Sequence, residues 1–210
     1  MANAQVPRAP LPVLSVPAAA DRSRCWWAGS DPLLIAYHDE EWGRPVHDDT
    51  RLFEMLSLEA FQAGLSWLTI LRKRDAFRAA FLRFDPEVVA LFDDSDRARL
   101  MSDAGIVRNR AKIDATIGNA AALLELIHEH GSFHSWLAQG VPLPAVPLPA
   151  DAPPDSLPAT TPVSDALSRE LKKRGFRFVG STIVYSFMQA VGLVDDHLPG
   201  CFRYRALVER

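Results

Sequence analysis

The chain has 210 residues, of which 48% are hydrophobic and 23% are charged, ordinary values for a globular protein with a sizeable core. Its formal net charge of −3 at pH 7 excludes a uniformly basic nucleic-acid binder, although local basic patches remain compatible with it. Two cysteines are too few for a disulfide scaffold. No apolar run reaches the length of about 18 residues that predicts a transmembrane helix, so we expect no membrane association.

The two ends of the chain differ in character. Residues 1–22 are rich in alanine, proline and valine, and they lack the basic start and unbroken apolar stretch of a signal peptide. We predict a disordered or loosely attached tail over 1–22, a folded domain over 23–210 and a cytoplasmic protein. Within the domain, about 140–163 contains eight prolines, which excludes a regular helix or a central strand and predicts a surface loop.

Hydrophobic periodicity predicts helices along most of the remaining chain, while strand signals are short and isolated. The strongest candidate is a helix over 51–73, which Asp49 or Thr50 can cap. Ser164 is the expected cap of a later helix, and Gly192 the expected end of the last one. The predicted helices cover 51–73, 75–83, 86–92, 95–103, about 109–129, near 133–137, 165–174 and 181–191. The class is therefore mostly α.

Four candidate metal ligands stand near the two ends of the predicted domain. Twelve residues separate Cys25 from His38, and three separate His197 from Cys201. Cysteine and histidine are the preferred zinc ligands, and four of them form a closed tetrahedral site. The alternative is that these residues are unrelated, since cysteine is often buried without a function. A four-ligand site would pin both ends of the fold and would be structural, because it leaves no open position for water.

Glu59 occupies an unusual place in the predicted 51–73 helix. At 3.6 residues per turn it shares the apolar stripe with Leu52, Leu56 and Ile70. A buried carboxylate is costly unless it is paired or hydrogen-bonded. One interpretation is a buried ion pair with an arginine, or an error in the helix phase. The other is a carboxylate held in a pocket for a cationic or donor-rich ligand.

Aromatic side chains are concentrated in the first third of the predicted domain, which contains four of the five tryptophans. Aromatic faces attract cations and stack on planar bases, so this concentration favours a ligand pocket around Glu59. Ordinary core packing is the alternative for at least half of these rings. The residues concerned are Trp26, Trp27, Tyr37, Trp42 and Trp67.

A basic patch lies around a predicted turn between two helices. Residues 104–113 carry Arg108, Arg110 and Lys112 but no acidic residue, and Gly105 lies in the turn. A helix–hairpin–helix presents backbone N–H groups at a helix N-terminus, which suits a DNA phosphate. The alternative is a solvated helix end, where basic residues also interact favourably with the helix dipole. Further basic clusters occur at 72–74 and 165–179.

Residues 24–201 resemble the DNA-3-methyladenine glycosylase I family of bacterial alkylation-repair enzymes. The resemblance covers nearly the whole folded chain and includes several long, unusual stretches in the same order. These stretches are RCWW at 24–27, DPLLIAYHDEEWG at 31–43, LFEMLSLEAFQAGLSW at 52–67, FDP at 84–86, DAGIVRNRAKI at 103–113, SDALSRELKKRGFRFVG at 164–180 and YSFMQAVGLVDDH at 185–197. One position departs from the pattern, because many members have an aromatic residue where this sequence has Leu34.

The resemblance implies an all-α helix–hairpin–helix DNA glycosylase fold, with one structural Zn²⁺ per chain joining the N- and C-terminal segments. It implies a catalytic Glu59 and DNA-backbone contacts from a hairpin. The implied zinc ligands are Cys25, His38, His197 and Cys201. The implied base-binding residues are Trp27, Tyr37 and Trp67, together with Trp42 and Ser186 from matching segments. The expected backbone-binding residues are Gly105, Arg108, Arg110 and Lys112.

The activity that the resemblance implies is DNA repair by hydrolysis of the N-glycosidic bond of 3-methyladenine. The substrate would be alkylated double-stranded DNA with the damaged base flipped out, and the product free 3-methyladenine. We identify no lysine nucleophile, so we expect a monofunctional enzyme without a lyase step. We also expect a monomer. Two alternatives are a DNA-binding module without activity and a hydrolase with a catalytic zinc.

Overall fold

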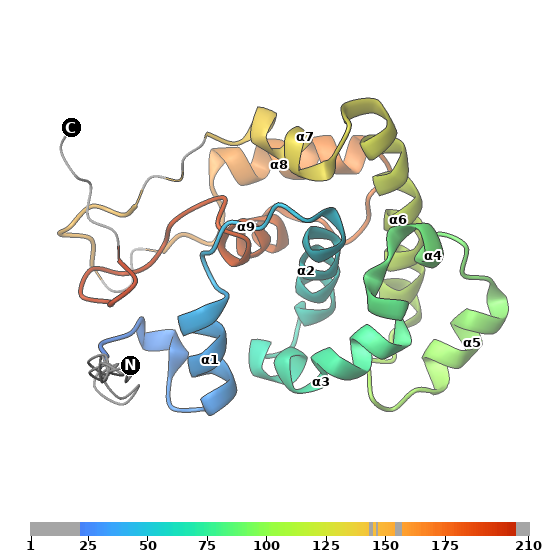
Figure 1. Cartoon of the computed structure of the whole chain (residues 1–210), viewed down its shortest axis with the longest axis horizontal. Coiled ribbons are helices and arrows are strands. Elements are labelled where there is room, and N and C mark those ends of the chain that lie inside the picture. The colour runs from blue at the N-terminus through green and yellow to red at the C-terminus, as the bar shows by residue number, and fades with distance from the viewer. Residues whose placement is uncertain (1–21, 143–144, 146, 154–156, 205–210) are drawn as a thin grey trace, which may run out of the picture.

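The structure is a computed structural model that describes residues 22–142, 145, 147–153 and 157–204. These residues form helices and no sheet strand, with a single parallel bridge between Pro147 and Asp195 (Figure 1). The prediction of an all-α class is therefore confirmed. Within the described ranges, no helix combines the length and the apolar character that crossing a bilayer would need. The tail predicted over 1–22 lies outside these ranges, apart from Arg22.

Two short 3₁₀ turns accompany the α-helices. The turns are η2 (Trp26–Ala28) and η3 (Leu82–Phe84). The helices are α1 (Pro32–Glu40), α2 (Asp49–Gln62), α3 (Trp67–Ala80), α4 (Pro86–Val89), α5 (Asp94–Ser102), α6 (Arg110–His130), α7 (Phe133–Gly140), α8 (Pro162–Lys173) and α9 (Ser181–Ala190).

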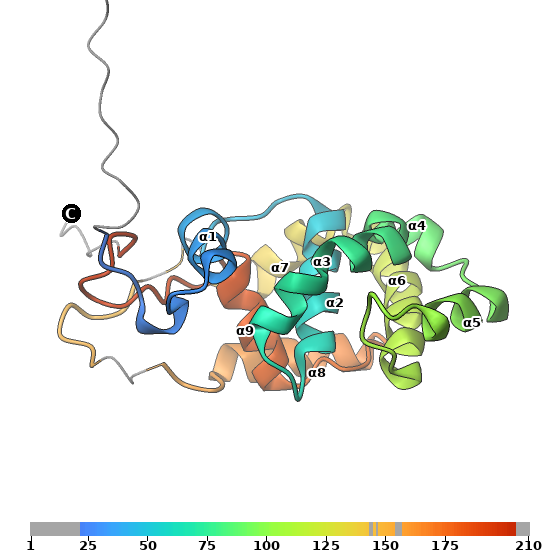
Figure 2. The same ribbon diagram turned by 90° about the horizontal axis from the view of Figure 1, so that it is seen from below.

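Helix α2 is the centre of the fold. Every residue from Leu52 to Phe61 is buried, as expected of a helix enclosed on all sides rather than packed along one face. Its neighbours are α3, α6, α7 and α9. In Figures 1 and 2, α1 lies at one end of the molecule, and α4, α5 and the start of α6 lie at the other.

Two predicted helices, 51–73 and 75–83, are wrong in their extent, because α3 continues without a break from Trp67 to Ala80. The expected helix over 51–73 is two helices, α2 and α3, separated by four residues. Gly64 in this turn has φ +84°, a left-handed conformation that ends a helix, and the Ser66 side chain then accepts a hydrogen bond from the Thr69 N–H to begin α3. Ile70 therefore does not continue the stripe that contains Glu59.

Two helix caps also differ from the predictions. Asp48, rather than Asp49 or Thr50, caps α2. Thr161, rather than Ser164, caps α8, because Pro162 suits the first helical position and Ser164 completes a reciprocal capping box. Sequence reasoning also missed α1, which begins at a capping Asp31 followed by a proline.

A close backbone crossing joins the segment after α1 to the end of α9. Gly192 has φ +72°, and a Cβ atom there would lie 2.6 Å from the Arg44 carbonyl carbon. Two backbone hydrogen bonds flank the crossing. The Gly43 N–H donates to the Gln189 carbonyl, and the Val46 N–H donates to the Val191 carbonyl. Only glycine permits this approach, which places the early aromatic segment against α9.

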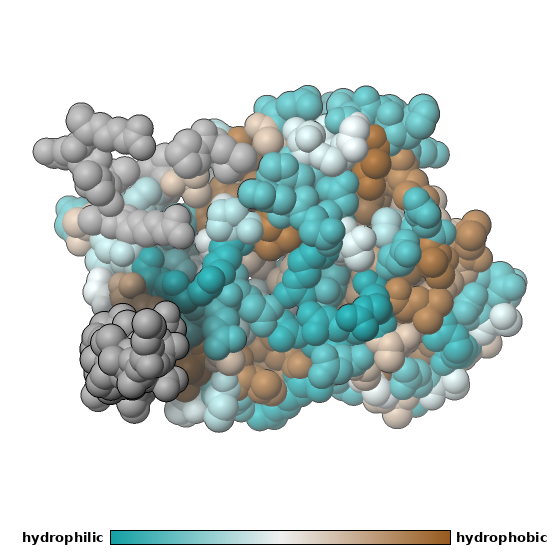
Figure 3. Space-filling view, in the orientation of Figure 1, coloured by the Kyte–Doolittle hydropathy of each residue, from teal (hydrophilic) through white to brown (hydrophobic). Residues whose placement is uncertain are grey.

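The described residues between α7 and α8 form no helix, as the prolines predict, and Tyr204 donates a hydrogen bond to the Leu148 carbonyl there. On the face seen in Figure 3, hydrophilic side chains cover most of the surface. Among the exposed large hydrophobic residues, Leu82, Val88 and Leu91 lie in or next to η3 and α4.

Candidate functional site

A cavity of about 200 Å³ lies where η2, α1, the α2–α3 turn and α9 meet. The structure brings the predicted catalytic residue and all five predicted base-binding residues together around it. The cavity is lined by Trp27, Tyr37, Trp42, Glu59, Gln62, Trp67, Leu157, Ser186 and Gln189. Leu34 packs against the hydrophobic core instead.

The aromatic walls of the cavity hold one another at steep angles. The ring centroids of Trp27 and Trp42 are 4.8 Å apart and those of Tyr37 and Trp67 are 5.2 Å apart, at 67° and 52° between ring planes. Edge-to-face packing of this kind is favourable for aromatic pairs. Trp26, by contrast, is exposed and lies outside the cavity lining.

Two buried glutamates on α2 have opposite environments. Glu54 is neutralised by ion pairs with Arg51 at 2.7 Å and Arg78 at 2.8 Å. Glu59 is 5% exposed, and within the described chain it has neither an ion pair nor a hydrogen-bond partner. The buried-arginine interpretation therefore applies to Glu54, whereas Glu59 faces the aromatic cavity.

Burial away from water raises the pKa of Glu59 to about 8, because the charged form loses its hydration without gaining a partner. Burial also raises the pKa of Tyr37, and the nearby Glu59 adds to that effect. Burial thus favours a protonated Glu59 at neutral pH, and a cation beside it would favour the carboxylate.

Sequence reasoning missed three residues of the lining. Gln62 follows Glu59 by three positions on α2, and Gln189 follows Ser186 by three on α9, so the spacing of one helical turn contained the signal for both. Leu157 comes from the proline-rich connection, where no local pattern indicates which residue turns inward.

The four predicted metal ligands form one buried cluster, with all ligand atoms within 4.8 Å of one another. The His197 Nδ1 atom is 3.7 Å from both cysteine Sγ atoms, and the His38 Nε2 atom is 3.4 Å from the Cys201 Sγ. Ligands of one tetrahedral zinc ion are about 3.3–3.8 Å apart, given bond lengths of about 2.0–2.3 Å. The donor set therefore fits such an ion.

One of the two cysteines in the cluster is favoured as a thiolate. Hydrogen bonding from the Cys25 thiol, and then from His197 and His38, lowers the pKa of Cys201 well below its usual range. A thiolate is the form of cysteine that binds a metal.

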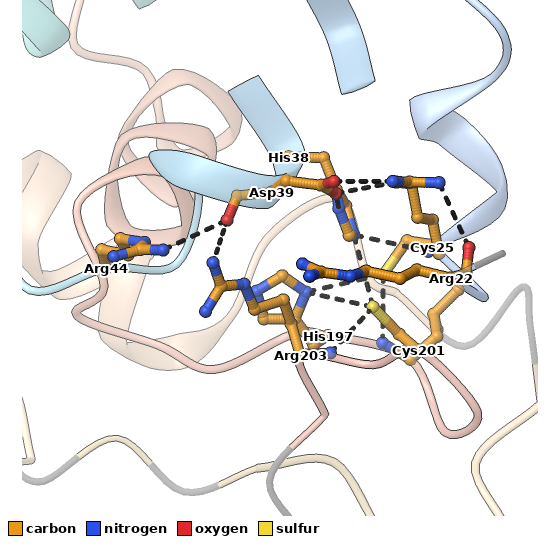
Figure 4. A network of polar contacts seen from close by, with 10 residues as sticks. Arg22, Cys25, His38, Asp39, Arg44, His197, Cys201 and Arg203 are labelled. Atoms are coloured by element: carbon orange, nitrogen blue, oxygen red, sulfur yellow. Dashed lines mark hydrogen bonds and ion pairs between the residues drawn. The ribbon is translucent and has the colours of Figure 1, made fainter. Parts of the chain in front are cut away.

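A second layer of polar contacts orients His38 (Figure 4). Its Nδ1 atom lies 2.8 Å from the Asp39 carboxylate, which leaves Nε2 directed toward the cluster. Arg24 binds the same carboxylate at 2.7 and 2.8 Å, and Arg203 donates to the Asp39 carbonyl. Burial acts to raise the pKa of Asp39, but hydrogen bonds from Arg24 and His38 outweigh it and lower that pKa.

The predicted hairpin is the connection between α5 and α6. Its Gly105 N–H donates to the Asp103 carboxylate, and Lys73 holds the turn by donating to the Ala104 and Gly105 carbonyls at 3.0 and 3.1 Å. Arg108 is exposed. Arg110 is also exposed, and it pairs with Asp114 on its own helix.

Lys112 differs from the expectation of a phosphate-facing cation. Its side chain is buried, and the ammonium donates to the carbonyls of Phe61 at 2.9 Å and Ala63 at 2.7 Å. Burial lowers its pKa. Lys112 thus satisfies carbonyl groups at the C-terminal end of α2, next to the cavity, because α6 begins directly beside that end.

The basic stretch 165–179 belongs to a second helix–turn–helix, formed by α8 and α9. The N-terminus of α9 has Gly180 at its cap position and no side-chain cap, whereas Asn109 caps α6 by accepting from the Lys112 N–H. Arg177 in the α8–α9 turn is exposed. The backbone amides that begin α9 are therefore less satisfied internally than those of α6.

A family model described as methyladenine glycosylase matches residues 27–204, which include the cavity lining and three of the four residues of the Cys/His cluster. The chain belongs to the methyladenine glycosylase family. It is 52% identical over 182 residues to the DNA-3-methyladenine glycosylase 1 of Escherichia coli (strain K12), covering 86% of this chain and 96% of that protein. It is 45% identical over 180 residues to the DNA-3-methyladenine glycosylase of Haemophilus influenzae, covering 85% and 96%.

Solved structures of methyladenine glycosylases agree with this assignment. A crystal structure of 3-methyladenine DNA glycosylase I superposes with a TM-score of 0.83 at 50% identity, covering 87% of this chain and all of that one. A structure from Staphylococcus aureus, described as the structural basis of 3-methyladenine recognition, has a TM-score of 0.83 at 37% identity, covering 88% and 98%. The all-helical fold of this chain therefore matches that of solved members of the family.

Proposed function

We propose that this protein is a DNA-3-methyladenine glycosylase that hydrolyses the N-glycosidic bond of 3-methyladenine in alkylated double-stranded DNA. The observation that carries the proposal is Glu59, an unpaired buried carboxyl group inside an aromatic cavity. A cationic planar base would satisfy both features, since aromatic faces attract cations and a carboxylate stabilises positive charge.

The chemistry of the substrate explains why so little acid–base machinery is needed. Methylation at N3 makes adenine cationic and weakens its bond to the sugar. A water molecule attacks the sugar carbon and releases a proton to the solvent, the electron pair of the N-glycosidic bond passes to the base, and the base leaves neutral. The enzyme's task is to flip the nucleotide into the cavity and hold it there. No lyase step is included, because this mechanism uses water rather than a lysine as the nucleophile.

Each cavity residue has a role in this mechanism. Trp27 and Trp67 stack on the base and favour its charged form, with Tyr37, Trp42 and Ser186 completing the surface. Glu59 ionises beside the cationic base, accepts hydrogen bonds from it and stabilises the positive charge that develops on the sugar.

The DNA backbone is expected to lie along the two helix–turn–helix connections. Gly105 and the exposed Arg108 and Arg110 support phosphate contacts at the α5–α6 hairpin. The uncapped start of α9, with Arg177 beside it, supports a second contact. Lys112 is left out of this interface because its ammonium is committed to backbone carbonyls.

The metal assignment is one structural Zn²⁺ held by Cys25, His38, His197 and Cys201. When bound, this ion supplies four strong bonds that join the two ends of the domain and leaves no position for water. We further propose that 23–210 is one catalytic domain that acts on DNA as a monomer, with 1–22 as an appended tail.

The deciding experiment is to incubate the purified protein with methylated duplex DNA and identify the released bases by chromatography. The proposed function requires free 3-methyladenine and intact DNA strands. A DNA-binding module would bind the duplex in a salt-dependent way and release no base. A hydrolase with a catalytic zinc would lose activity on chelation before any loss of fold.

A further inference from the structure

Gln189 is the one amide side chain that α9 contributes to the cavity lining, and the protein core determines its orientation. Its Nε2 atom donates to the Asp196 carboxylate at 2.8 Å. The Tyr185 hydroxyl donates to the same carboxylate oxygen at 2.5 Å. Both Tyr185 and Asp196 are buried, so these contacts lie on the side of Gln189 that faces away from the cavity.

The amide of Gln189 has only one acceptable orientation. Turning it over would place its carbonyl oxygen against the Asp196 carboxylate, so that two acceptors would face each other. Its backbone is anchored as well, because the Gln189 carbonyl accepts a hydrogen bond from the Gly43 N–H at 3.1 Å. The Oε1 atom is therefore the acceptor that Gln189 has left for a ligand, while the second Nε2 hydrogen remains its only other donor.

A second amide in the lining follows the same rule. Gln62 donates one Nε2 hydrogen to the Leu65 carbonyl at 2.7 Å, which likewise fixes its amide and leaves its side-chain oxygen as an acceptor. Together with Glu59, these groups make the polar lining rich in acceptors.

We infer that Gln189, locked by Asp196, is a specificity-determining residue that makes the cavity select 6-amino purines over 6-oxo purines. This inference rests on the proposed function and adds to it the basis of base discrimination. An exocyclic amine can donate to the Gln189 oxygen, whereas a 6-oxo group would leave two acceptors facing each other and unpaired. Discrimination of this kind arises from the hydrogen-bonding edge rather than from the positive charge.

The test compares the affinities of free 3-methyladenine and 3-methylhypoxanthine, which differ at position 6, using tryptophan fluorescence or calorimetry. The wild type should prefer the amino base. Gln189→Met preserves the side-chain length but removes the acceptor, and should lower the preference about tenfold, the value of one hydrogen bond. Gln139→Met is the matched control, because Gln139 is exposed on α7 and should leave the preference unchanged.

A second variant breaks the lock without changing the cavity lining. Asp196→Asn offers an amide that can donate to Gln189, so the Gln189 side chain can turn over and present its NH₂ group. The preference should again fall. Because Asp196 precedes His197, metal content and Tm are measured on the same sample. If Gln189→Met does not fold, Asp196→Asn by itself tests the role of Gln189.

The outcomes separate this inference from the proposed function. Wild-type preference in folded Gln189→Met, or in Asp196→Asn with its metal content intact, would overturn the role of Gln189 while base release from DNA continued. Failure of the wild type to release 3-methyladenine would instead overturn the proposed function.

Discussion

At the scale of the residue, the contrast between Glu54 and Glu59 separates structural from functional burial. Both carboxylates lie on α2 and both are buried, but only Glu54 has arginine partners. A paired carboxylate belongs to the packing of the core. An unpaired buried carboxyl group lowers the stability of the fold, and the binding of a cationic ligand offsets that loss.

Replacement of that carboxylate tests its role directly. Glu59→Gln keeps the size and polarity of the side chain but cannot ionise, so we expect the excision rate on methylated duplex DNA to fall about 10²–10⁴-fold with the fold unchanged. The rate is measured in single turnover, and circular dichroism checks the fold. A variant that excises at the wild-type rate would exclude Glu59 from catalysis.

The raised pKa of Glu59 also predicts how stability depends on pH. The ordinary value is 4.5 and the folded value is about 8, so the folded protein binds this proton more tightly than the unfolded chain. Its stabilising effect is complete below pH 4.5 and is lost as pH rises through about 8, on the order of 5 kcal/mol in all. Glu59→Gln should remove this loss, so its Tm should exceed that of the wild type at pH 8. Parallel Tm curves from pH 5 to pH 8 would contradict this expectation.

At the scale of the element, the turn between α2 and α3 lies between the cavity and the α5–α6 hairpin. The turn follows Gln62 and precedes Trp67, both in the lining, and Lys112 at the start of α6 binds its carbonyls. Lys73 on α3, in turn, donates to two carbonyl groups of the α5–α6 hairpin. The two lysines therefore link α2, α3 and α6 through backbone carbonyl groups. A side-chain substitution in the α2–α3 turn would not remove these carbonyl groups.

The stabilising role of Lys112 predicts a stability defect. Lys112→Met leaves two carbonyl groups without their donor, and should lower the free energy of unfolding by about 2 kcal/mol, or Tm by about 5 °C. Arg110→Met, two positions away but exposed, should change Tm little. Equal melting temperatures for Lys112→Met and the wild type would show that these hydrogen bonds contribute nothing.

The exposed arginines of the hairpin predict a different phenotype. Arg108→Gln should weaken binding to duplex DNA and reduce the slope of log affinity against log salt by about 1, because one phosphate contact is lost. Lys112→Met serves as the control, since its ammonium faces the protein interior and the salt slope should stay at the wild-type value. An unchanged slope in Arg108→Gln would place the phosphates elsewhere.

At the scale of the whole molecule, the Cys/His cluster joins the two ends of the described chain. Cys25 and His38 come from the start and His197 and Cys201 from the end, and the Phe202 N–H also donates to the Ser23 carbonyl. An ion at this place closes a loop that includes nearly the entire fold, which lowers the entropy of the unfolded chain.

Loss of one metal ligand should therefore lower the stability of the fold rather than act directly on catalysis. Cys201→Ala should reduce bound zinc from one ion per chain toward zero and lower Tm by about 10 °C or more. Metal analysis and thermal melting measure both effects, with His134→Ala as a control at a histidine outside the cluster. Full zinc occupancy in Cys201→Ala would contradict the proposed ligand set.

The sequence by itself determined the helical class, most helix positions and most residues of the two candidate sites. Periodicity, caps and ligand types are local properties, and the long matching stretches add the family. It did not reveal the break at Gly64, because apolar residues recur at helical spacing in the sequence on both sides of the turn. Gly64 and Ser66 are nevertheless the residues that end and begin helices.

Only the tertiary structure decided which charged groups have partners. Glu54 forms an ion pair with Arg78 on α3, and Lys112 donates to a carbonyl of α2. Glu59 faces the cavity, and Asp196 fixes the orientation of the Gln189 side chain. These outcomes depend on the distances between elements remote in the chain. A buried group's charge and orientation are set by the neighbours that replace its water, and the fold brings those neighbours together.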